Sequence, residues 1–410
     1  MQCSWRLCAM AAAASLVVVS ACSSAGGTPS ASKDATFNIG VVTAQTGTLA
    51  QVDGDLIVPV VKAFAAYYNK QGGILGHQIK LYIRDDGSSV EQAASAIRQL
   101  TQETSLDAVI PDYVSAEGLA LLPVTNSAKV ITMEACITPD CWNAEKYPYN
   151  FNVNPPPSAI DIALADYVKA NHVQKVGIIA DDDTSGQSFA SAISGLAKAS
   201  GFTIVGTQYV PAGATSVATQ LAILRSAGAQ ALAAFPDATP LNVLMSGVQE
   251  TGWKAKVICP NCFNQAVPVA KLVPGAVAKQ LLCVCDRVGA RQGDTLPPVA
   301  QELSTVMKAY GGLQDVQVTA LVADMMAFIR YAYQTAGKLD PSAAVNALNN
   351  IGKDTSLAKS TQFYLWRGIN VGFTSKSHLP LTSATVKDGF ALEQVSPEIQ
   401  GTYVGTPLNY

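Results

Sequence analysis

Histidine is scarce in this sequence, which contains three among 410 residues: His77, His172 and His378. None of them falls at the expected end of a strand beside a serine or cysteine and a carboxylate, so a nucleophile would have no evident general base. The sequence after residue 21 also lacks the Gly-x-Ser-x-Gly turn of many hydrolases and the Gly-Lys-Ser/Thr loop that binds phosphates. We therefore expect a protein that is not an enzyme and that needs no cofactor or metal ion.

Charged residues are also few. They make up 14% of the chain, with 27 lysines and arginines against 30 aspartates and glutamates, a formal net charge of −3. No basic cluster is present that could neutralise the phosphates of a nucleic acid, so no nucleic-acid partner is expected. The acidic run Asp181–Asp183 is too short for a calcium loop, which needs a longer alternation of oxygen ligands, and it is interpreted as a polar turn.

Long apolar runs are confined to the N-terminus. Arg6 is followed by an apolar stretch at 7–19, shorter than the roughly 20 residues that a membrane-spanning helix requires. Small residues then lead to Cys22, an ending that resembles a bacterial lipobox, in which the cysteine carries the lipid. We expect residues 1–21 to be a signal peptide, Cys22 to be lipidated, and 22–35 to tether the protein flexibly to the extracytoplasmic face of the cell membrane. An ordinary cleaved signal with an incidental cysteine is the alternative.

Short apolar runs alternate with longer amphipathic stretches through most of the remaining chain. This alternation predicts an α/β fold with doubly wound parallel sheets and helices on both faces, and two successive series predict two lobes. The predicted strands are 37–43, 79–84, 107–110, 129–133, 175–180, 202–209, 230–234, 256–259 and 280–285, and the predicted helices include 55–69, 91–101, 117–125, 298–309 and 319–336.

The proline run Pro155–Pro157 is the natural crossover between the two series. Neither series looks complete by itself, so the remaining chain is expected to return to both lobes. The expected division assigns 36–154 and 287–360 to lobe 1, and 155–286 and 361–410 to lobe 2.

A resemblance to a known family rests on short motifs in a fixed order. They are Thr46-Gly47 after the first strand, Asn69–Gly76 (NKQGGILG) before a strand that ends in Asp85-Asp86, Ala180–Gly186 at a strand-to-helix turn, and Gly213–Thr215 before a helix. Over about 36–290, the chain resembles the leucine/isoleucine/valine-binding family of extracytoplasmic solute receptors, which have the type I periplasmic binding protein fold. Gly72, Gly73 and Gly76 also have a plain use as helix stop and turn residues.

The resemblance implies two lobes joined by a three-strand hinge, with the ligand cleft between them. Such a receptor, expected to be a monomer, closes on a small molecule and delivers it to the permease of an ABC transporter. In open parallel sheets ligands collect beyond the carboxyl ends of the strands, where helix N-termini present free N–H groups. The same fold used as a ligand sensor for a signalling partner is the alternative.

In lobe 1 the family binds a ligand carboxylate with a serine and neighbouring amides after the third strand. That loop here contains Ser115 and Ala116, and Ser115 could equally be the N-cap of the following helix. The loop after the fourth strand contains Ala135 and Cys136, and Cys136 stands where a threonine or serine is common.

In lobe 2 the resemblance points to three positions. Ser185 stands where the family often has an aromatic residue, and Asp237 lies in a turn that approaches the ligand. Asn261 falls where amino-acid binders keep an acid for the ammonium group, and an amide cannot replace that charge. Asp237 or Glu134 could supply the missing anion, or each could be a solvated loop charge. The expected ligand is therefore an amino acid, an amide or a related carboxylate, with an aromatic or hydrophobic acid as the alternative.

Six cysteines remain after the N-terminal region, an even number that predicts disulfides in an exported protein. Cys136 and Cys141 flank a short turn that can bring them together. In an extended strand the Cβ atoms of Cys283 and Cys285 would be about 6.5–7 Å apart, too far for a bridge. The expected pairs are then Cys259 with Cys283 and Cys262 with Cys285, with the crossed pairing and a zinc site of four cysteines as alternatives.

Overall fold

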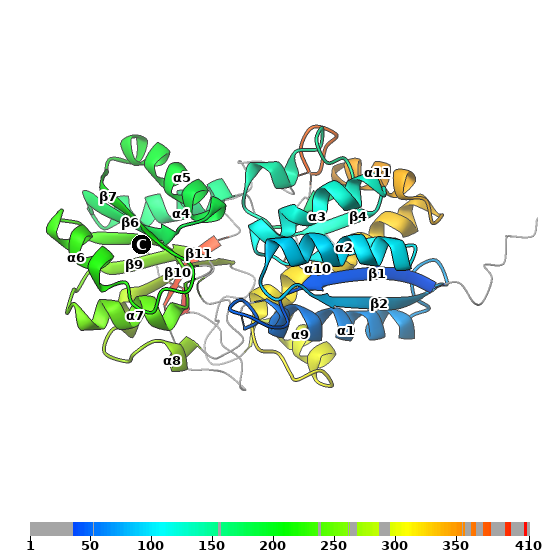
Figure 1. Ribbon diagram of the computed structural model, residues 1–410, viewed down its shortest axis with the longest axis horizontal. Helices are drawn as coiled ribbons and strands as arrows, with labels where there is room; N and C mark the ends of the chain where they lie inside the picture. Colours follow the sequence, from blue (N-terminus) through cyan, green and yellow to red (C-terminus); the bar gives the residue numbers. More distant parts are fainter. Residues whose placement is uncertain are drawn as a thin grey trace, which may run out of the picture.

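The computed structural model describes residues 36–51, 53–154, 157–236, 239–260, 262, 269–286, 296–354, 356, 362–365, 372–378, 390–394 and 406–407. These residues form two α/β lobes that lie next to each other (Figure 1). Each lobe is built around its own sheet. The predicted fold class is confirmed.

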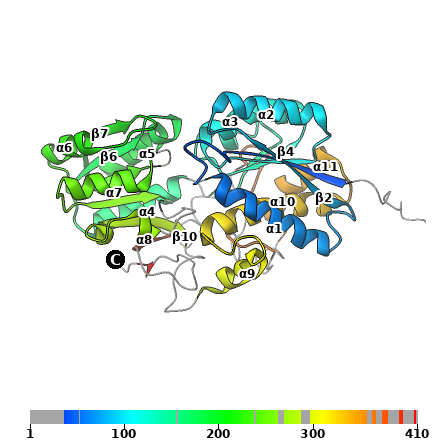
Figure 2. The ribbon, with the colours of Figure 1, turned by 60° about the horizontal axis from the view of Figure 1, so that its bottom comes forward.

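The first lobe contains a five-stranded parallel sheet in the order β2-β1-β3-β4-β5. Helices α1, α9 and α10 cover one face and α2 and α3 cover the other (Figure 2). The strands are β1 (Thr36–Thr43), β2 (Gln78–Asp85), β3 (Ala108–Pro111), β4 (Ile131–Glu134) and β5 (Asn150–Asn152). The helices are α1 (Gly54–Lys70), α2 (Val90–Glu103), α3 (Ser115–Ser127), η1 (Pro139–Trp142), α9 (Pro298–Met307), α10 (Val316–Ala336), α11 (Pro341–Asn349) and η4 (Ile351–Lys353).

Strand periodicity explains how both faces of this sheet are covered. Phe37, Ile39 and Val41 of β1 point toward the core that α1 and α10 complete, whereas Val42 points toward the core below α2 and α3. All four side chains are fully buried. A continuous apolar run is therefore the sequence pattern of a central parallel strand that is buried on both sides.

The second lobe contains a seven-stranded sheet in the order β12-β11-β10-β9-β8-β6-β7. Its first five strands along the chain are parallel, and β11 and β12 extend the β10 edge in the antiparallel sense. The strands are β6 (Lys175–Asp181), β7 (Thr203–Val210), β8 (Ala231–Phe235), β9 (Lys256–Pro260), β10 (Leu281–Asp286), β11 (Phe390–Gln394) and β12 (Thr406–Pro407). The helices are α4 (Pro157–Ala170), α5 (Thr184–Ser200), α6 (Ala218–Ser226), α7 (Leu241–Glu250), α8 (Val269–Leu272) and η2 (Ala278–Gln280).

All nine predicted strands and the five predicted helices are present, with ends that differ by a few residues. The short strand β5 and the helix α11 were not predicted. The sequence of β5 is Asn-Phe-Asn, and three residues with two amides carry no alternation of apolar side chains. The strand forms because β4 offers a free edge and Thr132–Glu134 pair with Asn150–Asn152.

The division between the lobes differs from the expected one near the C-terminus. Residues 362–365 and 372–378, assigned above to lobe 2, pack on lobe 1. Phe363 and Phe373 contact Phe328 of α10, and the Tyr364 amide donates to Asp324 of the same helix. His378 stacks on Phe151 of β5. The chain therefore returns to lobe 2 after residue 378, because aromatic side chains from this segment complete the lobe 1 core. The segments that join the lobes lie outside the described residues.

None of the helices within the described ranges is long and apolar enough to cross a membrane.

Two glycines at the end of α1, Gly72 and Gly73, have positive φ angles but differ in the space around them. Gly73 has φ of +73°, donates its N–H to the Tyr68 carbonyl and would place a Cβ 1.9 Å from the His77 carbonyl oxygen. Gly72 also has a positive φ, of +94°, but a Cβ there would meet open space. We expect Gly72→Ala to lower the free energy of unfolding by about 1 to 2 kcal/mol, the cost of a left-handed alanine. Gly73→Ala should cost clearly more because the clash is added, and equal urea-unfolding losses would contradict this.

Candidate functional site

Ser115 and Ala116 form the first turn of α3, directly beyond the carboxyl end of β3. The N-cap of this helix is Val114, whose side chain cannot cap it, so the N-cap role considered for Ser115 is wrong. Instead, the Ser115 hydroxyl oxygen accepts a hydrogen bond from the Ile137 amide at 3.1 Å. The hydroxyl hydrogen remains available to donate, beside a helix end that no side chain caps.

Two asparagine side chains hold the loop after β4, which contains Ala135 and Cys136. The Asn154 side chain donates to the Ala135 carbonyl at 3.0 Å, and the Asn152 side chain donates to the Cys136 carbonyl at 2.5 Å. Both Ala135 and Cys136 are buried, and Cys136 forms a disulfide with Cys141. These residues shape the loop that contacts Ser115, but their side chains offer no polar group to a ligand.

The corresponding helix of the second lobe, α5, begins beyond the carboxyl end of β6. Its N-cap is Asp183, whose carboxylate accepts from the Gly186 amide at 2.7 Å. Ser185 is buried in the first turn. A Cβ on Gly186 would lie 2.1 Å from the Asp181 carbonyl oxygen, so only glycine allows the helix to begin this close to the strand.

Helices α3 and α5, which belong to different lobes, contact each other. Glu117, in the first turn of α3, is buried, and one of its carboxylate oxygens has no hydrogen-bond partner among the described groups. Burial raises the pKa of Glu117, and the negative charges of Asp86, Asp183 and Glu91 raise it further.

Sequence reasoning did not select Glu117 or Asp183 as site residues. Glu117 lies two positions after Ser115 on the same helical turn, and Asp183 immediately precedes α5, so their places along the chain were visible. The electrostatic effect of one on the other was not, because it depends on how one lobe faces the other.

A chain of three buried carboxyl groups supports this end of the first sheet. Asp112 lies within hydrogen-bonding reach of Asp53 and Asp86, and all three are at most 1% exposed. One oxygen of each group accepts a hydrogen bond: Asp112 from the Ala44 amide, Asp53 from the Thr43 hydroxyl and Asp86 from the Ser88 amide. The other oxygen of each has no donor among the described groups. Carboxyl groups this close are stable only when they share protons. Burial raises the pKa of Asp53 to about 7, and it also raises the pKa values of Asp86 and Asp112.

Glu134, proposed above as a replacement anion, lies at the end of β4 beneath α3. It is fully buried, accepts a hydrogen bond from the Asn150 amide group, and lies 3.4 Å from the Cβ position of Gly118. Burial raises its pKa to about 8, so it is neutral at pH 7. Its carboxyl oxygens and the sulfurs of Cys136 and Cys141 lie within 4.8 Å of one another, but both sulfurs are in the disulfide. Glu134 therefore belongs to the interior of the lobe.

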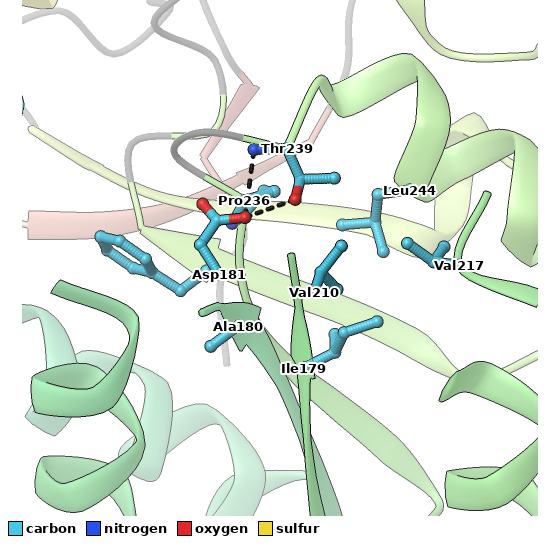
Figure 3. A pocket seen from close by; sticks show the side chains of 9 residues that line it. Ile179, Ala180, Asp181, Val210, Val217, Pro236, Thr239 and Leu244 are labelled. Carbon is cyan, nitrogen blue, oxygen red and sulfur yellow. Dashed lines mark hydrogen bonds between the residues drawn. The ribbon is translucent and has the colours of Figure 1, made fainter. Parts of the chain in front are cut away.

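A small cavity lies inside lobe 2 at the ends of β6 and β8 (Figure 3). Its volume of about 10 Å³ is room for one water molecule at most. Asp181 lines it and accepts hydrogen bonds from both the amide and the hydroxyl of Thr239, which fixes the turn after β8. This cavity is too small for a solute. Asp237, Asn261 and Cys22 lie outside the described residues.

Comparison with known proteins agrees with this architecture. Residues 36–368 match the family model described as periplasmic binding protein. The match spans well over half of the chain. The protein is a periplasmic binding protein.

Solved structures of similar fold come from several bacteria. A solute-binding protein of an ABC transporter from Rhodopseudomonas palustris HaA2, in complex with p-hydroxybenzoic acid, aligns with a TM-score of 0.75 and 17% identity, covering 92% of this chain and 96% of that one. A type 1 periplasmic binding protein from Bordetella pertussis Tohama I gives 0.73 and 19%, covering 91% and 100%. A leucine-binding protein LivK from Thermotoga maritima gives 0.71 and 16%, covering 90% and 97%. No curated protein sequence matches.

The family and its structural neighbours are solute-binding proteins, not enzymes, and the family name implies an extracytoplasmic location. At these identities the structural neighbours establish the fold of this binding protein and do not identify its ligand.

The disulfides of this periplasmic binding protein differ in part from the expected set. Cys136 pairs with Cys141 as expected, with Cα atoms 6.0 Å apart. The remaining expectation is wrong: Cys259 pairs with Cys262, and Cys283 pairs with Cys285. Strands β9 and β10 are parallel neighbours with Cys259 opposite Cys283, so the expected adjacency of the strands is correct.

Local backbone geometry explains the corrected pairing. The Cα atoms of Cys283 and Cys285 are 5.6 Å apart, closer than in a fully extended strand. Strand β9 ends at Pro260, and the following turn brings Cys262 to 5.8 Å from Cys259, measured between Cα atoms. Both separations suit a disulfide.

Trypsin can distinguish the two pairings. Cleavage after Lys256, Lys271, Lys279 and Arg287 gives peptides 257–271 and 280–287, each of which holds one local pair. We expect mass spectrometry without reductant to find two separate peptides, each 2 Da lighter than its dithiol form because a disulfide lacks two hydrogens. Reduced and alkylated protein is the control. A single species that contains both peptides would show that the strands are crosslinked instead.

The buried carboxyl groups predict an unusual pH dependence of stability. Aspartate has a pKa near 3.9 in the unfolded chain and about 7 at Asp53 in the folded one, so the folded state retains a proton that the unfolded state loses. Stability is then full below about pH 4 and decreases as the pH rises toward 7, by about 1.4 kcal/mol per pH unit for each such proton. Asp53→Asn should make the urea-unfolding slope against pH shallower.

The matched control is Asp55→Asn, an exposed aspartate on the first turn of α1. It should leave the slope unchanged. An unchanged slope in Asp53→Asn would mean that Asp53 is ionised in the folded protein.

Proposed function

We propose that this periplasmic binding protein is a lipid-anchored receptor that captures a small solute between its lobes and delivers it to an ABC permease. The observation that carries the proposal is the contact between α3 and α5, two helices from different lobes that each begin beyond the carboxyl end of an interior strand. A site formed from both lobes is completed only when the lobes approach each other, so binding and closure are coupled.

The first turn of α3 suits an anionic group of the solute. The Ser115 hydroxyl and the N–H groups of this uncapped turn can donate hydrogen bonds, and the helix dipole adds a partial positive charge. Ala116 is partly exposed there and leaves the backbone accessible. A carboxylate is the simplest group that fits, which supports an amino acid or a related carboxylate as the ligand.

The delivery step and the anchor rest on the sequence. The lipobox-like ending at Cys22 supports attachment to the membrane, and the ABC transporter neighbours support a permease as the partner. Receptors of this kind need to bind and release, and micromolar affinity corresponds to about −8 kcal/mol. Loss of solute uptake in cells that lack this protein would favour transport over sensing.

A thermal-shift screen of the oxidised protein tests capture. We expect at least one compound among amino acids, amides and aromatic acids, leucine and 4-hydroxybenzoate included, to raise the melting temperature. Ser115→Ala should weaken the best carboxylate ligand about tenfold or more, since a hydrogen bond to a charged group contributes about 1.5–3 kcal/mol.

Ser127→Ala, an exposed serine near the end of the same helix, is the matched control and should bind normally. If no compound shifts the melting temperature, the proposed capture function is wrong. If Ser115→Ala binds as tightly as the wild type, the carboxylate does not occupy the first turn of α3.

A further inference from the structure

The loop after β4 determines how the Ser115 hydroxyl is oriented. The Ile137 amide donates to the Ser115 hydroxyl oxygen at 3.1 Å, although the two residues are 22 positions apart in the chain. A hydroxyl group that accepts a hydrogen bond becomes a stronger donor, and its hydrogen turns away from the group that donates to it. Ile137 therefore fixes the direction in which Ser115 can donate.

Ile137 lies inside a short ring that a disulfide closes. Cys136 immediately precedes it and is bonded to Cys141, at a sequence separation of 5. The Thr138 hydroxyl oxygen lies 3.2 Å from the Cys136 sulfur and 3.3 Å from the Cys141 sulfur. The Cys141 amide also donates to the Thr138 carbonyl at 3.0 Å. Ile137 is thus flanked by a bridged cysteine on one side and by a residue that contacts both sulfurs on the other.

Two asparagines of β5 attach the ring to the sheet at both of its ends. The Asn152 side chain donates to the Cys136 carbonyl and the Asn150 side chain to the Cys141 carbonyl, each at 2.5 Å. Both cysteines and both asparagines are buried. When the disulfide is intact, the backbone between its ends has little freedom to move. Opening the bridge returns backbone freedom to this segment, so the Ile137 amide is no longer held against Ser115.

We propose that the disulfide between Cys136 and Cys141 positions the solute-binding hydroxyl of Ser115 through Ile137, so that reduction of this one bond lowers the affinity for carboxylate solutes. This inference rests on the proposed function and adds a redox control of the same site. A dithiol such as dithiothreitol supplies the two electrons and two protons: the two cysteines become thiols, and the dithiol becomes a cyclic disulfide. The sulfur atoms themselves do not have to touch the solute.

A double variant, Cys136→Ala with Cys141→Ala, removes the bridge. Leucine, 4-hydroxybenzoate and the other carboxylates of the screen are the probes, and calorimetry gives the dissociation constants. We expect the double variant to bind a carboxylate about three- to tenfold more weakly, because one hydrogen bond no longer orients the hydroxyl. Cys283→Ala with Cys285→Ala is the matched control, since it removes another local, fully buried bridge, and it should bind as the wild type does.

Three further measurements separate positioning from general loosening of the lobe. Dithiothreitol should weaken binding by the wild type as much as the double variant does, and reoxidation should restore it; mass spectrometry after alkylation confirms that the bond is open. In a Ser115→Ala background, loss of the bridge should weaken binding by less than about twofold more, because both changes act through one hydroxyl. Without any solute, the Ile137 amide should exchange its hydrogen about tenfold faster in the double variant, as measured by NMR.

Several results would overturn the inference. If Ser115→Ala weakens a carboxylate but the double variant and the reduced protein bind it normally, the disulfide does not position the site, while the capture function stands. If loss of the bridge weakens binding equally with and without Ser115, or if the Cys283 and Cys285 control weakens it as much, the effect is a general loss of stability. Unchanged exchange of the Ile137 amide would also contradict the inference. If no carboxylate binds the oxidised wild type, carboxylate capture fails and the inference fails with it.

Discussion

Parallel strands end at the same edge of their sheet, and this constraint places the candidate residues Ser115, Ala116, Ala135 and Ser185. In each lobe an interior strand leads directly into a helix whose first turn lies at that edge, β3 into α3 and β6 into α5. Helices α3 and α5 contact each other, and this contact joins the two lobes. The helix N-termini, their first-turn side chains and the loop after β4 therefore converge without any of them being close in sequence.

The same constraint brings acidic residues together at the strand ends, and these residues have different roles in the two lobes. The first lobe buries Asp53, Asp86 and Asp112 beneath the edge, where shared protons neutralise much of their charge. The second lobe uses its acids as structural acceptors: Asp181 fixes the turn at Thr239, and Asp183 caps α5. Acidic side chains at strand ends are thus mostly part of the framework.

Most of the fold could be predicted because central parallel strands are apolar on both faces, and this pattern is local. The short strand β5 could not be predicted, since its pairing with β4 and not its composition makes it a strand. The return of the chain to lobe 2 was placed too early for a similar reason. Phe363 and Phe373 join lobe 1 through Phe328 of α10, a contact between segments that are distant in sequence.

The candidate site was predictable in position but only partly in chemistry. Ser115 was identified because it follows the third strand, whereas its hydrogen bond to Ile137 depends on the fold of a second loop. The cysteine pairs show the same limit. The Cα atoms of Cys283 and Cys285 lie about 1 Å closer together than in an ideal extended strand, and this difference allows the two cysteines to pair with each other. A motif can therefore assign a residue to an edge of the sheet, but what that residue binds follows from its neighbours in space.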